Sequence, residues 1–189
     1  MRHAFNSFRM LFLAVLAFAL VACDEVPKEE DFEPLGDFKL GYAVVVTTST
    51  QVGPLSRKLP NEDFEASLTN ELKRVFGSFE GSRYYHISLS VDGYVLAQPG
   101  VPLVLSPKSA LIVTLNVWDD AKQKLILDEP KQFTVLEKFA AKNILGSGYT
   151  MSAEEQLAEL TKSTVKQVYK YLRENENLFK SEDGTPSDT

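Results

Sequence analysis

The sequence predicts an α+β fold, a two-layer sandwich of an antiparallel sheet of about four strands with two helices on one face. Two segments, residues 61–76 and 152–173, repeat apolar side chains at helical spacing on one side only. Four segments rich in β-branched and aromatic residues are typical of strands, in the order β-α-β-β-β-α. Short turns between consecutive strands favour antiparallel pairing, and two one-sided helices cover only one face of a sheet.

The first strand is expected at residues 39–49 (KLGYAVVVTTS), where β-branched residues dominate. A loop with Gly53 and Pro54 follows. The first helix is expected over residues 61–76, with Asn61 as its cap and two acidic residues in its first turn. Its apolar stripe consists of Phe64, Leu68, Leu72, Val75 and Phe76.

The segment of residues 84–96 (YYHISLSVDGYVL) alternates as a half-buried strand does. Asp92-Gly93 fits either a bulge or a tight hairpin turn, and the short segment that follows favours the bulge. Residues 110–118 (ALIVTLNVW) form the strongest predicted strand. A polar turn leads to a strand at residues 124–136, which Pro130 marks as an edge or a break. The two faces of the first segment are Tyr85, Ile87, Leu89 and Val91 against His86, Ser88, Ser90 and Asp92.

Residues 99–107 hold three prolines and are expected as a loop, which either covers the core as a lid or docks on a partner. The second helix is expected over residues 152–173, because Ser152 and Glu155 form a capping box. The polar residues 175–189 are expected to be a disordered tail. The apolar face of this helix consists of Leu157, Leu160, Thr164, Val168 and Leu172.

The only cysteine, Cys23, stands where the composition changes abruptly from apolar to acidic. The thirteen residues before it carry no polar side chain and would form a helix of about 20 Å, too short for roughly 30 Å of hydrocarbon. Arg2 and Arg9 precede this run, so residues 1–22 are predicted to be a signal peptide. The alternatives are an ordinary secretory signal cleaved after Ala19, and an uncleaved anchor, which the short run disfavours.

The residues LVAC at positions 20–23 resemble the lipobox of bacterial lipoproteins. This resemblance implies that Cys23 receives a diacylglycerol, that the signal peptide is cut before it, and that the new N-terminus is acylated. Two or three acyl chains make such an attachment effectively permanent. Asp24 resembles an inner-membrane retention signal, which favours the inner over the outer membrane. Residues 23–38 are then an acidic tether on the periplasmic side.

The chain as a whole resembles an uncharacterised family of small proteobacterial membrane lipoproteins. The segments concerned are LVAC, SVDGYVLAQPGVPLVLSPKSALIVTLNVWDDA and EPKQFTVLE. The resemblance implies a single periplasmic domain, here residues 39–174, with no assigned activity. Without residues 1–22 the chain has 18 basic and 26 acidic side chains, a formal charge of −8. It therefore has no electrostatic reason to bind nucleic acid.

Chemical motifs are few. His86 is the one histidine after residue 22, and Cys23 is expected to carry lipid, so Cys/His zinc sites are not expected. His86, Ser88 and Asp92 project from one strand face and suggest a hydrolase, but residues two apart on a strand are roughly 7 Å apart, too far for direct proton transfer. Asp119 and Asp120 lack the spacing of a calcium loop. We therefore expect neither a metal nor a cofactor.

The remaining candidate site is the solvent-facing side of the sheet, where hydroxyl and amide groups surround large apolar groups, a mixture suited to a protein or peptide partner. The sequence thus predicts a membrane-anchored periplasmic lipoprotein that acts as a non-enzymatic partner-binding or assembly module of the cell envelope. The alternatives are a carrier of a lipid or other apolar ligand, and a hydrolase using His86. The predicted partner-binding residues are His86, Ser88, Ser90, Asn116 and Trp118, with Val101 and Leu103 of the proline-rich loop.

Overall fold

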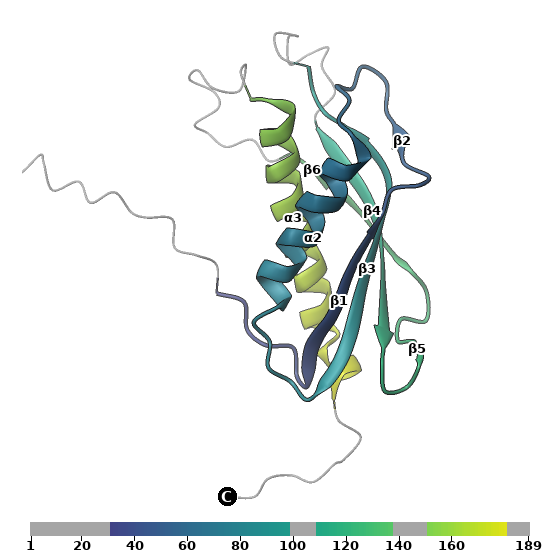
Figure 1. The fold of residues 1–189 in the computed structure, drawn as a ribbon, viewed down its shortest axis with the longest axis vertical. Coiled ribbons are helices and arrows are strands. Elements are labelled where there is room, and N and C mark those ends of the chain that lie inside the picture. Colours follow the sequence, from purple (N-terminus) through teal and green to yellow (C-terminus); the bar gives the residue numbers. More distant parts are fainter. Residues whose placement is uncertain (1–30, 99–108, 138–150, 181–189) are drawn as a thin grey trace, which may run out of the picture. The chain divides into compact units, whose positions relative to one another are not determined.

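The computed structural model describes residues 31–98, 109–137 and 151–180 (Figure 1). The chain divides into two compact units, Met1–Phe32 and Glu33–Thr189, and every described helix and strand belongs to the second. The described core therefore lies within this second unit. Its elements are β1 (Phe38–Val46), β2 (Gln51–Val52), α2 (Asn61–Phe76), β3 (Arg83–Val95), β4 (Ala110–Asp119), β5 (Lys124–Leu125), β6 (Lys131–Leu136), α3 (Ala153–Glu174) and the 3-10 helix η2 (Glu176–Phe179).

The α+β class is confirmed, but the sheet differs from the predicted one in strand number and direction. It is mixed and has six strands, with β3 and β4 antiparallel at its centre. On one side β1 and β2 run parallel to β3, because helix α2 carries the chain back across the sheet before β3 begins. On the other side β6 and β5 pair antiparallel with β4, and the segment containing Pro130 separates them.

Both helices pack on the same face of this sheet (Figure 1). Helix α2 has the expected bounds, and its five predicted stripe residues are buried. The predicted cap was wrong, since Pro60 occupies the N-cap position and no side chain caps the helix. The capping box of α3 is confirmed: the Glu155 N–H donates to Ser152 Oγ at 3.1 Å, and the Ser152 N–H donates to Glu155 Oε2 at 2.7 Å.

Strand β3 alternates as predicted, with Tyr85, Ile87, Leu89 and Val91 buried beneath the helices. Its register against β4 shifts between Val91 and Gly93, and the strand continues to Val95. The Asp92-Gly93 pair is thus a bulge and not a hairpin turn. The other side chains of β3 and β4 alternate with the buried ones and lie on the second face of the sheet. No described helix covers this face (Figure 1).

An aromatic cluster of Phe38, Phe76, Phe79, Tyr85 and Phe179 closes one end of the core. The ring of Phe179 meets those of Phe38 and Tyr85 edge-on, at centroid distances of 5.2 and 5.0 Å. Burial raises the pKa of the Tyr85 hydroxyl above its ordinary value. Phe179 lies in the segment expected to be disordered, and its complete burial places η2 inside the folded domain instead.

The last residues of the predicted tether also belong to the folded domain. Leu35 is fully buried, and the Tyr169 hydroxyl donates to the Glu33 carbonyl at 3.0 Å. Arg173, near the C-terminal end of α3, pairs with the Glu33 carboxylate at 2.6 Å. The packed part of the domain thus begins before residue 39 and ends after residue 174. We call the end of the domain where Glu33 meets α3 the tether end.

Candidate functional site

The candidate site is the sheet face that the helices leave uncovered, called the open face below. The strand register places the predicted residues in rows across it. His86 lies opposite Trp118, and Ser88 lies opposite Asn116. On the other side of β3, Val44 pairs with Ser88 in register. Four of the predicted residues are thus brought together as two cross-strand pairs, and Ser90 continues the set opposite Thr114.

An apolar stripe along β1 borders the polar residues Ser88, Ser90 and Asn116 at the centre of the open face. Val44 is 47% exposed and Val46 is 39% exposed, although both are large aliphatic side chains. Among the described residues, β1 pairs with no strand on its outer side apart from a single bridge between Lys39 and Glu80. The stripe and the unpaired backbone groups beside it form an edge to which another extended chain can add.

The polar side chains on β3 and β4 at the centre of the open face include groups with hydrogen-bond partners and one buried group without a partner. The carboxylate of Asp92, at the bulge, accepts hydrogen bonds from Thr114 at 2.6 Å and from Gln132 at 2.9 Å. In contrast, Asn116 Oδ1 is buried and has no hydrogen-bond partner. An unsatisfied buried acceptor costs about 1–3 kcal/mol, so a donor supplied by a bound chain would relieve that cost.

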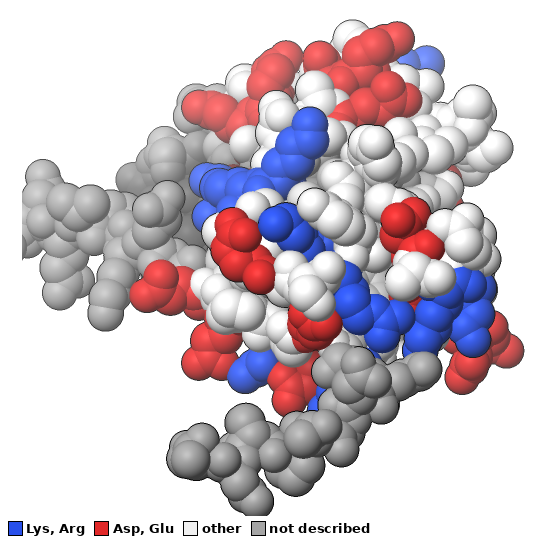
Figure 2. All heavy atoms as spheres, turned by 60° about the horizontal axis from the view of Figure 1, so that its bottom comes forward, with Lys and Arg blue, Asp and Glu red and all other residues white. Residues whose placement is uncertain are grey.

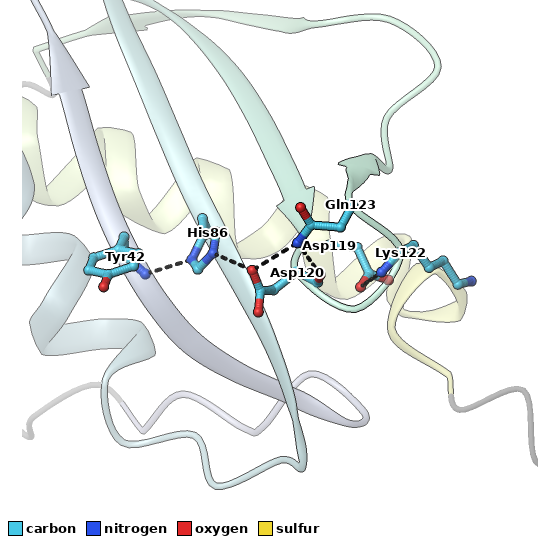
Figure 3. Close-up of polar contacts among 6 residues, drawn as sticks. All are labelled: Tyr42, His86, Asp119, Asp120, Lys122 and Gln123. Carbon is cyan, nitrogen blue, oxygen red and sulfur yellow. Dashed lines mark hydrogen bonds and ion pairs between the residues drawn. The ribbon is translucent and has the colours of Figure 1, made fainter.

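The His86 side chain on β3 forms a hydrogen bond with the backbone of β1 (Figure 3). Its Nδ1 accepts the backbone N–H of Tyr42 at 3.0 Å, and its Nε2 lies 3.4 Å from Asp120 Oδ1. The Tyr42 ring packs against the imidazole at a centroid distance of 5.0 Å. Gly41 makes this possible, because a Cβ there would stand 2.3 Å from His86 Nδ1. The register of β1 shifts at this point, which brings the Tyr42 N–H to the imidazole.

This geometry gives no support to a hydrolase. The two ring nitrogens of His86 contact other groups than Ser88 and Asp92: Nδ1 accepts the Tyr42 N–H, and Nε2 lies beside Asp120 (Figure 3). The neighbouring carboxylate of Asp119 is buried and pairs with Arg83 at 2.8 Å. Within the described ranges, no three His, Cys, Asp or Glu side chains are grouped to hold a metal ion.

Other predictions lie outside the described residues. These are the lipid attachment at Cys23 and the contributions of Val101 and Leu103. The carrier alternative places its ligand under the same proline-rich loop, so it stays a prediction. Where the layer between sheet and helices is described, fully buried side chains such as Phe64, Leu68 and Leu89 fill it. No helix in the described part of the chain is long and apolar enough to span a bilayer.

Sequence reasoning missed the part of the site on β1. Tyr42, Val44 and Val46 were expected inside a largely buried strand, because apolar residues follow one another there without alternation. Their exposure arises from the position of β1 at the edge of the sheet, which only the strand order determines.

Comparisons with known proteins give no family. No protein-family model matches the chain, and no curated protein matches its sequence. Among solved structures, a Xanthomonas campestris protein of the DUF330 family is similar at 12% identity and a TM-score of 0.44, over 76% of this chain and 91% of that one. A PelC dodecamer from Paraburkholderia phytofirmans is similar at 14% identity and a TM-score of 0.36, over 72% and 94%. A minor lipoprotein from Acinetobacter baumannii is similar at 15% identity and a TM-score of 0.29, over 67% and 93%. Likeness at this level assigns neither a family nor a function to this chain.

Proposed function

We propose that this protein is a lipid-anchored, non-enzymatic lipoprotein of the bacterial cell envelope whose domain binds a partner protein through the open face of its sheet. The anchor is Cys23, and the domain stands on the periplasmic side, at the inner membrane in view of Asp24. The lipobox resemblance and the apolar run before Cys23 support this location.

The observation that carries the partner-binding role is the exposed stripe of Val44 and Val46 on the edge strand β1, which in the described part of the chain has only the Lys39–Glu80 bridge on its outer side. Edge strands are commonly protected by charges, prolines or bulges, because a free apolar edge promotes association. Beyond the bulge at Gly41, the segment up to Val46 carries neither a charge nor a proline. The adjoining hydroxyl and amide groups of Ser88 and Asn116 supply the polar contacts typical of a protein interface.

The anchor and the partner surface require separate experiments. For the anchor, Cys23→Ser is expected to abolish incorporation of labelled palmitate and to release the domain from the membrane fraction. Unchanged labelling or unchanged membrane association of this variant would contradict the lipid attachment. Unchanged binding of a partner by the released domain would show that the two properties are independent.

For the partner surface, a photocrosslinking amino acid placed at Val44 is expected to yield one discrete adduct with an envelope protein in living cells. The same group at Lys170, exposed on the solvent side of α3, is the matched control and is expected to give no such adduct. Val46→Glu is expected to remove the Val44 adduct without unfolding the domain, since Val46 is already partly exposed. An adduct of equal yield from Lys170, or one that survives Val46→Glu, would refute the proposed surface.

A further inference from the structure

A second set of side chains, three exposed and one partly buried (Trp118), lies across the open face at the tether end. It consists of Tyr42 on β1, Tyr84 on β3, Trp118 on β4 and Leu125 on β5, and we call it the tether-end row. Tyr42 is 70% exposed, Tyr84 is 49% exposed and Leu125 is 50% exposed. His86, opposite Trp118 and in contact with Tyr42, joins the members of the row. Trp118 pairs directly with Leu125.

The row lies at the end of the domain where the tether is attached. Glu33 is held by Tyr169 and Arg173 in the last turns of α3. Phe38, at the start of β1, pairs with Arg83, and the Asp120 N–H beyond β4 donates to the Tyr84 carbonyl at 3.1 Å. The start of β1, the end of β4 and the end of α3 are therefore close to one another (Figure 1).

The length of the tether limits which end of the domain can reach the membrane. Ten residue steps separate Cys23 from Glu33, and a fully extended chain of this length spans at most about 35 Å. Helix α3 has 22 residues and is about 33 Å long. Bringing the opposite end of the domain to the bilayer would thus consume nearly the whole reach of the tether. The tether end needs no such extension.

The chemistry of these side chains favours contact with a lipid interface over contact with a charged partner surface. Tyrosine and tryptophan concentrate at membrane interfaces, where an apolar ring and a polar group are both accommodated. Figure 2, in which the tether end comes forward, shows Lys and Arg mixed with Asp and Glu around uncharged side chains. Lys39, for example, lies 5.7 Å from the centre of the Tyr84 ring but also pairs with Glu80 at 3.4 Å. Attraction of this surface to lipid thus does not depend on charge.

We propose that the tether-end row rests on the lipid interface of the bilayer that anchors the chain, and so fixes the orientation of the domain. The inference rests on the lipid anchor proposed above. Four side chains bind a bilayer only weakly on their own, but anchoring keeps them at high effective concentration beside it. In this orientation the Val44 and Val46 stripe and the Ser88–Asn116 pair lie farther from the membrane than the row does, where a partner can reach them.

Trp118, the only tryptophan of the chain, provides the test. The full lipoprotein is reconstituted into phosphatidylcholine vesicles whose acyl chains carry bromine near the headgroup. Trp118 is expected to lose most of its emission, to a similar extent with or without added phosphatidylglycerol. The matched control is Trp118→Phe with Leu136→Trp, which moves the tryptophan to an exposed position of the same face, about 26 Å along β4, and is expected to escape quenching.

Two single variants sharpen the test. Leu125→Glu is expected to reduce the quenching of Trp118, whereas Leu136→Glu, at a similarly exposed leucine, is expected to leave it unchanged. Unquenched Trp118 in protein that floats with the vesicles, or equal quenching at both tryptophan positions, would refute the orientation alone. Emission that shifts only with protein concentration would show that a second copy covers the row, and would also refute it. Protein that fails to float would remove the anchor and this inference together.

Discussion

Replacing Phe179 with alanine tests whether η2 is part of the folded domain. The side chain is fully buried, and its ring contacts those of Phe38 and Tyr85 at 5.2 and 5.0 Å. Truncating a buried phenylalanine to alanine costs about 3–5 kcal/mol, through lost burial and the cavity left behind. The loss of two edge-to-face ring contacts, each worth about 0.5–1.5 kcal/mol, favours the upper part of that range.

The assay is urea unfolding of the soluble domain, followed by far-ultraviolet circular dichroism. In thermal unfolding, a loss of about 4 kcal/mol in a domain of this size lowers the Tm by about 8–16 °C. The midpoint in urea is expected to fall while the slope of the transition stays constant, because the surface exposed on unfolding changes little. The control is Lys180→Ala at the next, exposed position, which is expected to stay within about 0.5 kcal/mol of the parent.

The reasoning would be refuted by a Phe179→Ala domain whose stability stays within about 1 kcal/mol of the parent, because a buried ring cannot be removed so cheaply. Deletion of residues 176–189 gives an independent check. It removes the same ring together with the carbonyl of Phe179, which accepts the Asp37 N–H at 3.0 Å. This deletion is therefore expected to destabilise the domain at least as much as the single substitution.

Three further predictions address the sheet and the second helix. Gly41→Ala is expected to cost about 1–2 kcal/mol of unfolding free energy, because the new Cβ displaces the His86 ring. In a His86→Ala background the same substitution is expected to cost much less. Additive effects of the two substitutions in this double-mutant cycle would contradict the contact. Because burial raises the pKa of Tyr85 above 10.0, its contribution to stability is complete below that pH and is lost as the pH rises above it. Tyr85→Phe, which also removes a hydroxyl without a hydrogen-bond partner, is expected to be at least as stable at pH 7 and to lose less stability in alkaline urea titrations. Ser152→Ala is expected to cost about 1 kcal/mol through the lost capping box, and an unchanged midpoint in urea would show that the cap contributes nothing.

The two proposed surfaces lie at different positions along the strands of the open face. The tether-end row lies beside the start of β1, and the Val44 and Val46 stripe lies beyond the Gly41 bulge. His86 stands between them, since it contacts Tyr42 and lies opposite Trp118. Loss of the imidazole is therefore expected to affect both surfaces through the position of β1, and variants at Val46 and Leu125 separate them better.

Features that depend on local sequence were predictable. The spacing of Phe64, Leu68 and Leu72 located α2, and the pair of Ser152 and Glu155 located the start of α3, because helix periodicity and capping involve residues close in the chain. The alternation around Ile87 likewise assigned the side chains of β3 to their two faces. From that alternation, the polar part of the open face followed before any strand pairing was known.

Features that join distant segments required the tertiary structure. Phe179 and its neighbour Leu178 are the two large apolar residues of an otherwise polar segment. The burial of Phe179 depends on Phe38 and Tyr85, which lie far away in the chain. The parallel pairing of β1 with β3 depends on the path of α2 across the sheet, and the strand order places Val44 at an exposed edge. Periodicity records which side of an element is apolar; it contains no information on which partner covers that side, because pairing free energies arise between residues that are not neighbours in sequence.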